Sequence, residues 1–184
     1  MGKILVTGAT GFVGKALGKR MVSNGWHVRG AVRSAEQGAN LPAGVEVIPI
    51  KSISADTDWS DALVGVNTVV HLAARVHVMN DTATDPLAAF RQVNVAGTER
   101  LAWMAATEGV KRFVYVSSVK VNGERCKTPF TKHNIPAPED PYGVSKWEAE
   151  QVLCKVAEDT GLEVVILRPP LVYGPGVKAN FLSL

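Results

Sequence analysis

The sequence lacks the features that mark several protein classes. Only two of its 184 residues are cysteine, Cys126 and Cys154, and neither belongs to a CxxC or Cys/His pattern. We therefore expect free thiols, and neither a disulfide nor a metal site. No apolar run reaches the roughly 18 residues that a membrane span needs. The N-terminus also lacks the apolar stretch of a signal peptide, so we expect a cytoplasmic protein with no membrane partner.

Charge imbalance is also absent. The chain has 20 Lys and Arg residues against 17 Asp and Glu residues, a net charge of +3, and the two signs are well mixed. No basic run or aromatic–basic stripe occurs, so we expect no nucleic-acid partner. The hydrophobic fraction of 46% is sufficient for the core of one domain and excludes a disordered chain. The 17 Gly and 10 Pro residues follow no period, which excludes a collagen-like chain.

The sequence does contain a regular alternation of short apolar strands and helices. Strands made of nearly continuous Val, Ile and Leu are typical of a parallel sheet that is covered on both faces. The predicted fold class is α/β, a doubly wound parallel sheet with helices on both faces. The expected strands are Lys3–Thr7, His27–Val32, Val45–Ile50, Thr68–Leu72, Arg112–Ser117 and Glu163–Leu167. The expected helices are Phe12–Ser23, a short helix capped within 56–58 and ending at Leu63, Pro86–Glu108 and Pro141–Asp159.

A glycine-rich loop follows the first strand directly and opens a helix. Its pattern is GxxGxxG, in which glycine lets the backbone turn tightly and approach a pyrophosphate, while the last glycine lets the helix pack on the strand. The helix N-terminus offers free N–H groups to the phosphates. This context favours a dinucleotide site over a contact between helices made by small residues. The loop residues expected to bind the cofactor are Gly8, Thr10, Gly11, Phe12, Val13 and Gly14.

The end of the second strand bears on which dinucleotide binds. No acidic residue is present there to accept a hydrogen bond from the ribose 2′-OH of NAD, and Arg33 follows the strand at once. A guanidinium can form charge-assisted hydrogen bonds to the 2′-phosphate of NADP. The alternative is a solvated surface arginine. We expect NADP or NAD as cofactor, and Arg33 favours NADP.

A third motif is Tyr142-Gly-Val-Ser-Lys146. Asp140 is a plausible N-cap and Pro141 fits the first helical turn, so Tyr142 and Lys146 should share one helix face. A phenol is a poor base at neutral pH, but an adjacent ammonium and a nicotinamide cation would lower its pKa. Lys146 can also hold the cofactor ribose. A Tyr and a Lys at this spacing are common by chance, so a catalytic interpretation needs a further catalytic residue elsewhere in the chain.

Ser118 is the candidate for that further residue. It follows the strand Arg112–Ser117, and the carboxyl end of a strand is where doubly wound folds bind ligands. Its hydroxyl can polarise a substrate carbonyl while Tyr142 exchanges a proton with it.

Together these motifs resemble the extended short-chain dehydrogenase/reductase family, and within it the NAD-dependent epimerase/dehydratase group. The segments that carry the resemblance are TGATGFVG, HLAA (His71–Ala74), NVAGT (Asn94–Thr98), VYVSSVKVNG and YGVSK. The resemblance implies a Rossmann fold. Residues 1–168 would form the dinucleotide-binding domain, and 169–184 would begin a substrate lobe that is largely missing from a truncated chain.

The resemblance also implies an activity. Family members act on nucleotide sugars, as 4-epimerases or 4-keto-reductases, by hydride transfer at a sugar C4 hydroxyl or ketone. A UDP-linked sugar is the expected substrate and a homodimer the expected assembly of the parent protein. The alternative is a dinucleotide-binding module without catalysis, at least in truncated form. The implied residues are Ser118, Tyr142 and Lys146 for catalysis, and Ala73, Ala74, Asn94, Tyr142, Lys146 and Pro169 for the cofactor.

Four places in the chain depart from the family pattern, and one of them is Asn122, which replaces a frequent Tyr. Lys51-Ser52-Ile53 stands where an Asp usually contacts adenine, and Leu171 replaces a frequent Asn. Lys120 stands where epimerases often have a small polar residue. It can bind substrate or a phosphate, or it can be a solvated loop lysine, and the sequence leaves this choice open.

Overall fold

The computed structural model describes residues 2–76, 84–125, 128–131 and 133–177. Cys126 lies outside the described residues, and Cys154 is a free thiol. No helix in the described part of the chain is long and apolar enough to cross a membrane.

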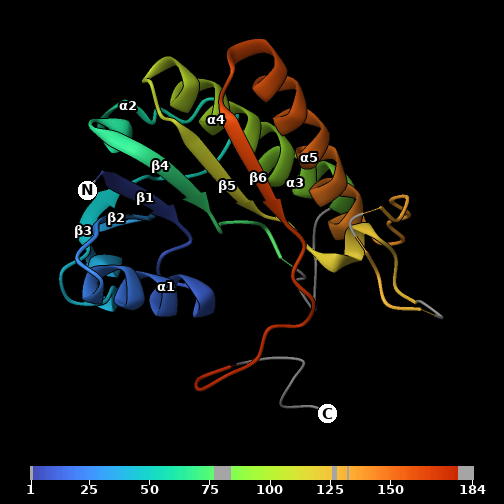
Figure 1. Ribbon diagram of the computed structural model, residues 1–184, viewed down its shortest axis with the longest axis horizontal. Helices are drawn as coiled ribbons and strands as arrows, with labels where there is room; N and C mark the ends of the chain where they lie inside the picture. Colours follow the sequence, from blue (N-terminus) through green and yellow to red (C-terminus); the bar gives the residue numbers. More distant parts are fainter. Residues whose placement is uncertain (1, 77–83, 126–127, 132, 178–184) are drawn as a thin grey trace.

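Six parallel strands form one sheet in the order β3-β2-β1-β4-β5-β6 (Figure 1). This order confirms the predicted doubly wound sheet. Successive strands are added on one side of β1 up to β3 and on its other side from β4 onward. The place between β1 and β4 is therefore a topological switch point, which opens a crevice at the carboxyl ends of the strands. The strands are β1 (Lys3–Thr7), β2 (His27–Val32), β3 (Glu46–Pro49), β4 (Val66–His71), β5 (Arg112–Val116) and β6 (Glu163–Leu167).

Helices cover both faces of the sheet, as predicted. Figure 1 shows α1 (Phe12–Ser23) on one side and α3 (Pro86–Arg91), α4 (Gly97–Thr107) and α5 (Pro141–Thr160) on the other. The alternation of side chains along β1 supplies both cores: Ile4 and Val6 lie in the cluster that α1 covers, and Leu5 lies in the cluster under α4 and α5.

The helices α3 and α5 begin with the same type of N-cap. Asp85 and Asp140 each precede a proline, and each carboxylate accepts a hydrogen bond from a backbone N–H three residues on, at 3.0 and 2.6 Å. These are N-caps followed by proline in the first turn, as expected for Asp140. α5 ends at Gly161, whose φ of +76° closes the helix in the left-handed conformation.

The structure corrects two predicted helices. The stretch expected as one α-helix from Pro86 to Glu108 is interrupted by one turn of π-helix, η2 (Gln92–Ala96), before α4 begins. The short helix α2 is Ser60–Leu63 and ends where predicted, but its N-cap is Trp59 and not a residue within 56–58. There the Thr57 hydroxyl bonds locally to the backbone of Ser52 and Ser54, which competes with helix formation. Two short 3₁₀ helices were not predicted, η1 (Ala35–Asn40) and η3 (Val119–Val121).

Candidate active site

The loop between β1 and α1 has room only for glycine at two positions. Gly8 has a φ of +65°, and a Cβ on it would lie 2.8 Å from the backbone nitrogen of Ala73. A Cβ on Gly14 would lie 2.2 Å from the carbonyl oxygen of Gly8. The N–H of Gly11 donates to that same oxygen at 2.9 Å and closes the turn. The loop therefore lies directly on the end of β4, and α1 lies directly on the loop.

The N-terminus of α1 is open. Gly11 is its N-cap, no side chain caps the helix, and no acidic residue stands in its first turn. Phe12 and Val13 are 37% and 39% exposed. Thr10 and these residues border a cavity of about 1070 Å³ whose far wall is the segment 172–177. Free N–H groups at the positive end of a helix, beside open space, fit the phosphates of a dinucleotide.

Arg33 follows β2 at the same edge of the sheet. Its backbone N–H donates to the side chain of Gln37 at 3.2 Å. Its side chain is exposed, and no carboxylate in the described part of the chain pairs with its guanidinium. The acidic side chain nearby, Glu36, is held by Ser34, which lowers the pKa of the Glu36 carboxyl. Arg33 is thus free to meet an anionic ligand.

A buried histidine joins β1, β4 and α4 beneath the crevice. His71 is 1% exposed; its Nδ1 lies 2.6 Å from the Thr7 hydroxyl and its Nε2 lies 3.0 Å from the Thr98 hydroxyl. The Thr7 oxygen also accepts the N–H of Ala73 at 3.1 Å, which links the end of β1 to the segment after β4. Burial lowers the pKa of His71 to about 3, and the ring is neutral. Ala73 and Ala74 follow in the same segment and are both half-buried, and the backbone of Ala73 lies against Gly8.

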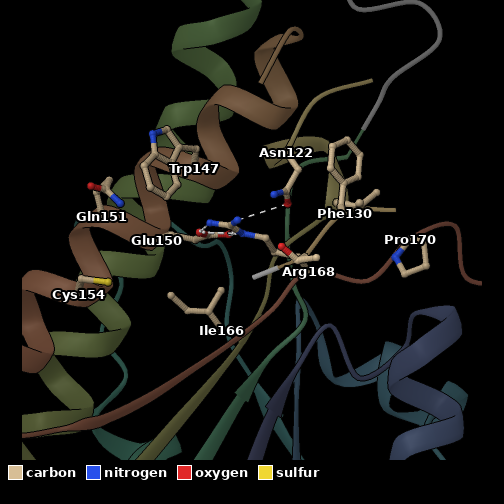
Figure 2. Close-up of a pocket in the computed structure, with 11 residues that line it drawn as sticks. Asn122, Phe130, Trp147, Glu150, Gln151, Cys154, Ile166, Arg168 and Pro170 are labelled. Atoms are coloured by element: carbon tan, nitrogen blue, oxygen red, sulfur yellow. Dashed lines mark hydrogen bonds and ion pairs between the residues drawn. The ribbon is translucent and has the colours of Figure 1, made fainter. Parts of the chain in front are cut away.

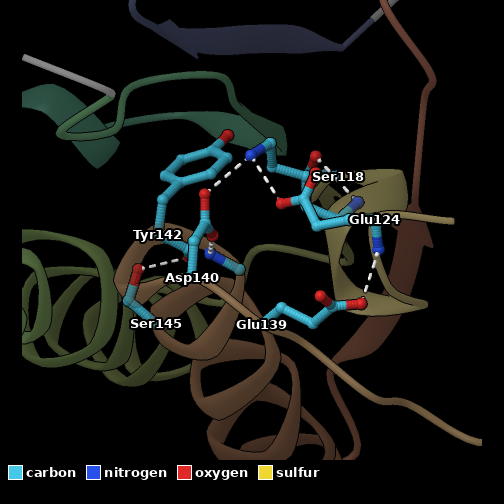
Figure 3. Close-up of polar contacts among 8 residues, drawn as sticks. Ser118, Glu124, Glu139, Asp140, Tyr142 and Ser145 are labelled. Atoms are coloured by element: carbon cyan, nitrogen blue, oxygen red, sulfur yellow. Dashed lines mark hydrogen bonds and ion pairs between the residues drawn. The ribbon is translucent and has the colours of Figure 1, made fainter. Parts of the chain in front are cut away.

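Ser118 and Tyr142 stand on neighbouring elements and face a common space (Figure 3). Ser118 ends the β5 segment, and its hydroxyl oxygen accepts the N–H of Lys120 at 3.2 Å. Tyr142 lies in the first turn of α5 and packs edge-on against Phe90, with ring centroids 6.1 Å apart. Burial raises the pKa of Tyr142, Asp140 raises it further, and Lys120 and Ser118 lower it.

Lys146 lies one turn further along α5 and is almost fully buried. Its Nζ donates to the carbonyl oxygen of Val116 at 2.7 Å and lies 4.0 Å from the centroid of the Tyr115 ring. Burial lowers the pKa of Lys146 to about 7, against the opposing effect of Glu150. The expectation that an ammonium lowers the pKa of Tyr142 therefore needs correction. In the structure the net shift of the Tyr142 pKa is upward. The lysine that opposes this upward shift is Lys120 and not Lys146.

A buried ion pair supports this corner of the site. Glu150, one turn after Lys146, is 2% exposed and accepts from the Ser117 hydroxyl at 2.5 Å and from the Arg168 guanidinium at 2.5–3.2 Å. Figure 2 shows Arg168 between Glu150 and Asn122, whose Oδ1 it reaches at 3.3 Å. Asn122, Glu150 and Arg168 line a cavity of about 750 Å³ beside β6. The network ties the ends of β5 and β6 to α5.

The two remaining predicted residues, Asn94 and Pro169, join separate segments by hydrogen bonds. Asn94, in the π-helical turn, accepts the N–H of Arg75 at 2.7 Å and donates to the Arg75 carbonyl at 3.0 Å and to the Ser145 hydroxyl at 2.9 Å. Its side chain therefore joins the segment after β4 to α5. The Pro169 carbonyl accepts the N–H of Val119 at 3.0 Å, which joins the turn after β6 to η3.

The predicted residues thus converge on one edge of the sheet, where β1, β4, β5 and β6 end. The sequence did not point to Thr7, Phe90 or Tyr115 as parts of the site. The usable signal for Glu150 was a carboxylate on the buried face of α5, four residues after Lys146. No group of three His, Cys, Asp or Glu residues in the described ranges could hold a metal ion.

Known protein families and known proteins show what the chain is similar to. A family model described as NAD dependent epimerase/dehydratase family matches residues 4–183. Over 184 aligned residues the chain is 49% identical to a UDP-glucose 4-epimerase of Vibrio cholerae, and the alignment covers 98% of this chain and 55% of that protein.

Two solved structures have the same architecture. One is a UDP-glucuronic acid 4-epimerase from Bacillus cereus in complex with NAD, 28% identical, with a TM-score of 0.80 over 94% of this chain and 57% of that one. The other is a UDP-glucose 4-epimerase from Thermotoga maritima with UDP-glucose, 27% identical, with a TM-score of 0.76 over 90% and 54% of the two chains. The chain spans about half the length of the relatives it matches.

Proposed function

Because the chain belongs to the NAD-dependent epimerase/dehydratase family, we propose that it is the dinucleotide-binding half of an enzyme that epimerises a UDP-linked sugar at C4. The observation that carries the proposal is the meeting of Ser118, Tyr142 and Lys146 with an open glycine loop at one edge of the sheet. The identity of 49% to a UDP-glucose 4-epimerase supports the choice of substrate class.

The residues present fit a bound dinucleotide. The uncapped N-terminus of α1 would hold the pyrophosphate, Arg33 would lie near the adenosine ribose, and Ala73 and Ala74 would line the middle of the crevice. The turn at Pro169 would border the nicotinamide end. When bound, the cofactor supplies reversible hydride exchange with the sugar carbon.

Tyr142 is the proton-transfer group in this proposal. Its phenol exchanges a proton with the sugar O4, and its raised pKa keeps it protonated in the free chain. Ser118 holds the same oxygen by a hydrogen bond. Lys146 supplies positive charge one helical turn from Tyr142. Because its pKa is about 7, only a part of the Lys146 side chains is charged at neutral pH.

A nucleotide-sugar 4-keto-reductase is the second candidate, and Arg33 is the observation that favours it. A reductase consumes NADPH in each turnover, and a free arginine at the end of β2 suits a 2′-phosphate. An epimerase oxidises and reduces the same carbon, so its cofactor is regenerated. Cofactor consumption therefore separates the two candidates.

A chimera tests the proposal. Residues 1–184 are joined to the part of the V. cholerae relative that the alignment does not cover. We expect interconversion of UDP-glucose and UDP-galactose without net consumption of cofactor. A Tyr142→Phe chimera should lose about 10²–10⁴-fold in rate while it still binds dinucleotide. A Tyr142→Phe chimera with full activity would contradict the role of Tyr142, and oxidation of NADPH by a 4-keto sugar would favour the reductase.

A further inference from the structure

The side chain of Lys120 connects the two elements that carry Ser118 and Tyr142. Lys120 is the middle residue of η3, the turn that begins at Ser118. Its Nζ donates to Asp140 Oδ2 at 2.6 Å and to Glu124 Oε1 at 2.8 Å. Asp140 is the N-cap of α5, two residues before Tyr142, and its other oxygen accepts the N–H of Gly143 at 2.6 Å. Figure 3 shows this chain of contacts beside the Tyr142 ring.

The surroundings of Lys120 argue against a role in binding an anion. Two carboxylates already engage its ammonium, and the N–H of Glu124 donates to a third carboxylate, Glu139, at 3.3 Å. The cluster of Lys120, Glu124, Glu139 and Asp140 therefore contains more negative than positive charge. A phosphate or a sugar carboxylate would be repelled there. Of the two roles that the sequence left open for Lys120, neither substrate binding nor free solvation fits.

We propose that Lys120 is a positioning residue for Tyr142. Its ion pair with Asp140 holds the first turn of α5 against the Ser118 turn and balances the negative charge beside the Tyr142 hydroxyl. The inference rests on the proposed function, because only there does the Tyr142 proton take part in a reaction.

The charges around Tyr142 support this role. On its own helix stand Asp140 and Lys146, and η3 contributes Lys120. Asp140 raises the pKa of Tyr142 and Lys120 lowers it, so the two effects oppose each other and loss of either member exposes the effect of the other. The other ionisable groups packed around this corner are Glu124 on the loop after η3, Tyr115 on β5, and Arg75, which lies over the Phe90 ring at 5.5 Å.

Asp140→Asn separates charge from structure. Asparagine is as good an N-cap as aspartate, so the hydrogen bond to Gly143 survives while the negative charge is removed. Lys120→Gln removes the positive charge, and Lys120→Arg keeps it. Lys155→Gln is the matched control, because Lys155 also pairs with an aspartate on α5, Asp159, but at the far end of the helix.

The experiment is a titration of Tyr142 in the 184-residue chain itself. All three tyrosines are replaced by 3,5-difluorotyrosine, whose phenol ionises at a lower pH than tyrosine, and ¹⁹F NMR follows each one. A Tyr142→Phe variant assigns the Tyr142 signal. Circular dichroism verifies that each variant is folded.

We expect opposite shifts from the two members of the pair. Lys120→Gln should raise the Tyr142 titration midpoint by about 0.5–1 pH unit and Asp140→Asn should lower it by a similar amount, with the partial exposure of both side chains limiting the size. The double variant should return close to wild type. Lys120→Arg and Lys155→Gln should leave the midpoint unchanged.

Unchanged midpoints in folded Lys120→Gln and Asp140→Asn chains would overturn the inference. If Lys120→Gln does not fold, Asp140→Asn and the double variant decide the question by the same criterion. The titration uses neither cofactor nor substrate. A chain that shows these shifts but binds no dinucleotide would therefore overturn only the proposed function, whereas dinucleotide binding without the shifts would overturn only the inference.

Discussion

Two ionisable side chains lie buried beneath the crevice, and both have lowered pKa values. His71 is neutral, and its two ring nitrogens join Thr7 on β1 to Thr98 on α4. Lys146 is buried against the Tyr115 ring, and its pKa of about 7 makes it sensitive to whatever binds above it. At the scale of residues, the crevice therefore lies above an uncharged histidine and one lysine that changes charge near neutral pH.

The lowered pKa of Lys146 predicts a pH dependence of stability. The folded chain releases this proton near pH 7 and the unfolded chain keeps it to about pH 10.5, so between these values the unfolded state binds more protons. The free energy of unfolding should then rise with pH, by at most about 1.4 kcal/mol per unit. Lys146→Met should abolish this rise. Urea denaturation across this pH range checks it, with Lys155→Met as the control that keeps the rise; equal slopes in wild type and Lys146→Met would contradict the assignment.

Arg33 predicts a preference between dinucleotides. A charge-assisted hydrogen bond to a 2′-phosphate contributes about 1.5–3 kcal/mol, or roughly 10–150-fold in affinity, and less for a solvated arginine. Arg33→Ala should therefore reduce an advantage of NADP(H) over NAD(H), and added salt should reduce it as well. Calorimetric titration of both dinucleotides measures this, with exposed Arg20 on α1 as the control substitution. A wild-type chain that binds both equally would show that Arg33 is a solvated surface residue.

Sequence reasoning predicted the helical placement of Tyr142 and Lys146 better than it predicted the surroundings of these two residues. The spacing of Tyr142 and Lys146 on one helix follows from the period of a helix, and the Asp140 cap follows from local chemistry. The pKa of Tyr142 depends on burial and on a group distant in sequence, Lys120, and no local pattern reports those.

At the scale of elements, the β1–loop–α1 unit is set by close packing of backbone on backbone. The same unit allows a matched comparison of two helical glycines. A Cβ on Gly14 would meet the Gly8 carbonyl oxygen at 2.2 Å, whereas a Cβ on Gly18 would first meet the Val45 side chain at 3.5 Å. Gly14 and Gly18 are both buried, so burial alone does not distinguish them.

Gly14→Ala should lower the free energy of unfolding by about 1–3 kcal/mol and weaken dinucleotide binding, because the loop must move away from α1. Gly18→Ala should leave binding unchanged and should be neutral or stabilising by up to about 1 kcal/mol, since alanine favours the helix. Urea denaturation and calorimetry measure both effects. Equal losses of stability and of dinucleotide affinity in the two variants would contradict the idea that Gly14 is required for the geometry of the loop.

Elements with a strong apolar pattern were predictable, and irregular turns were not. The bounds of β1, α1, β2 and β6 match the sequence prediction because each is a clear periodic or apolar run between glycine or polar stops. The π-helical turn at 92–96 has no such signal. It is stabilised by tertiary contacts, among them the hydrogen bonds of Asn94 to Arg75 and Ser145.

At the scale of the whole molecule, six parallel strands bring residues from four separate segments to one edge of the sheet. The doubly wound class of the sheet follows from β/α alternation and the handedness of crossovers, so the sequence was sufficient to predict that class. One face of the sheet is covered by α1 at β1 and β2 but is more exposed at β6. On that face, Val165 and Leu167 of β6 are 39% and 48% exposed. The chain spans about half the length of its relatives, so we expect it to bind dinucleotide and to turn over sugar nucleotide poorly without a second half.

The most direct test of this account is calorimetric titration of NAD(H) and NADP(H) into the 184-residue chain. We predict that one dinucleotide binds per chain, that Gly14→Ala weakens the binding, and that Tyr142→Phe leaves it nearly intact. A folded chain that binds neither dinucleotide would contradict the central claim that the edge of the sheet between the glycine loop and Lys146 is a cofactor site.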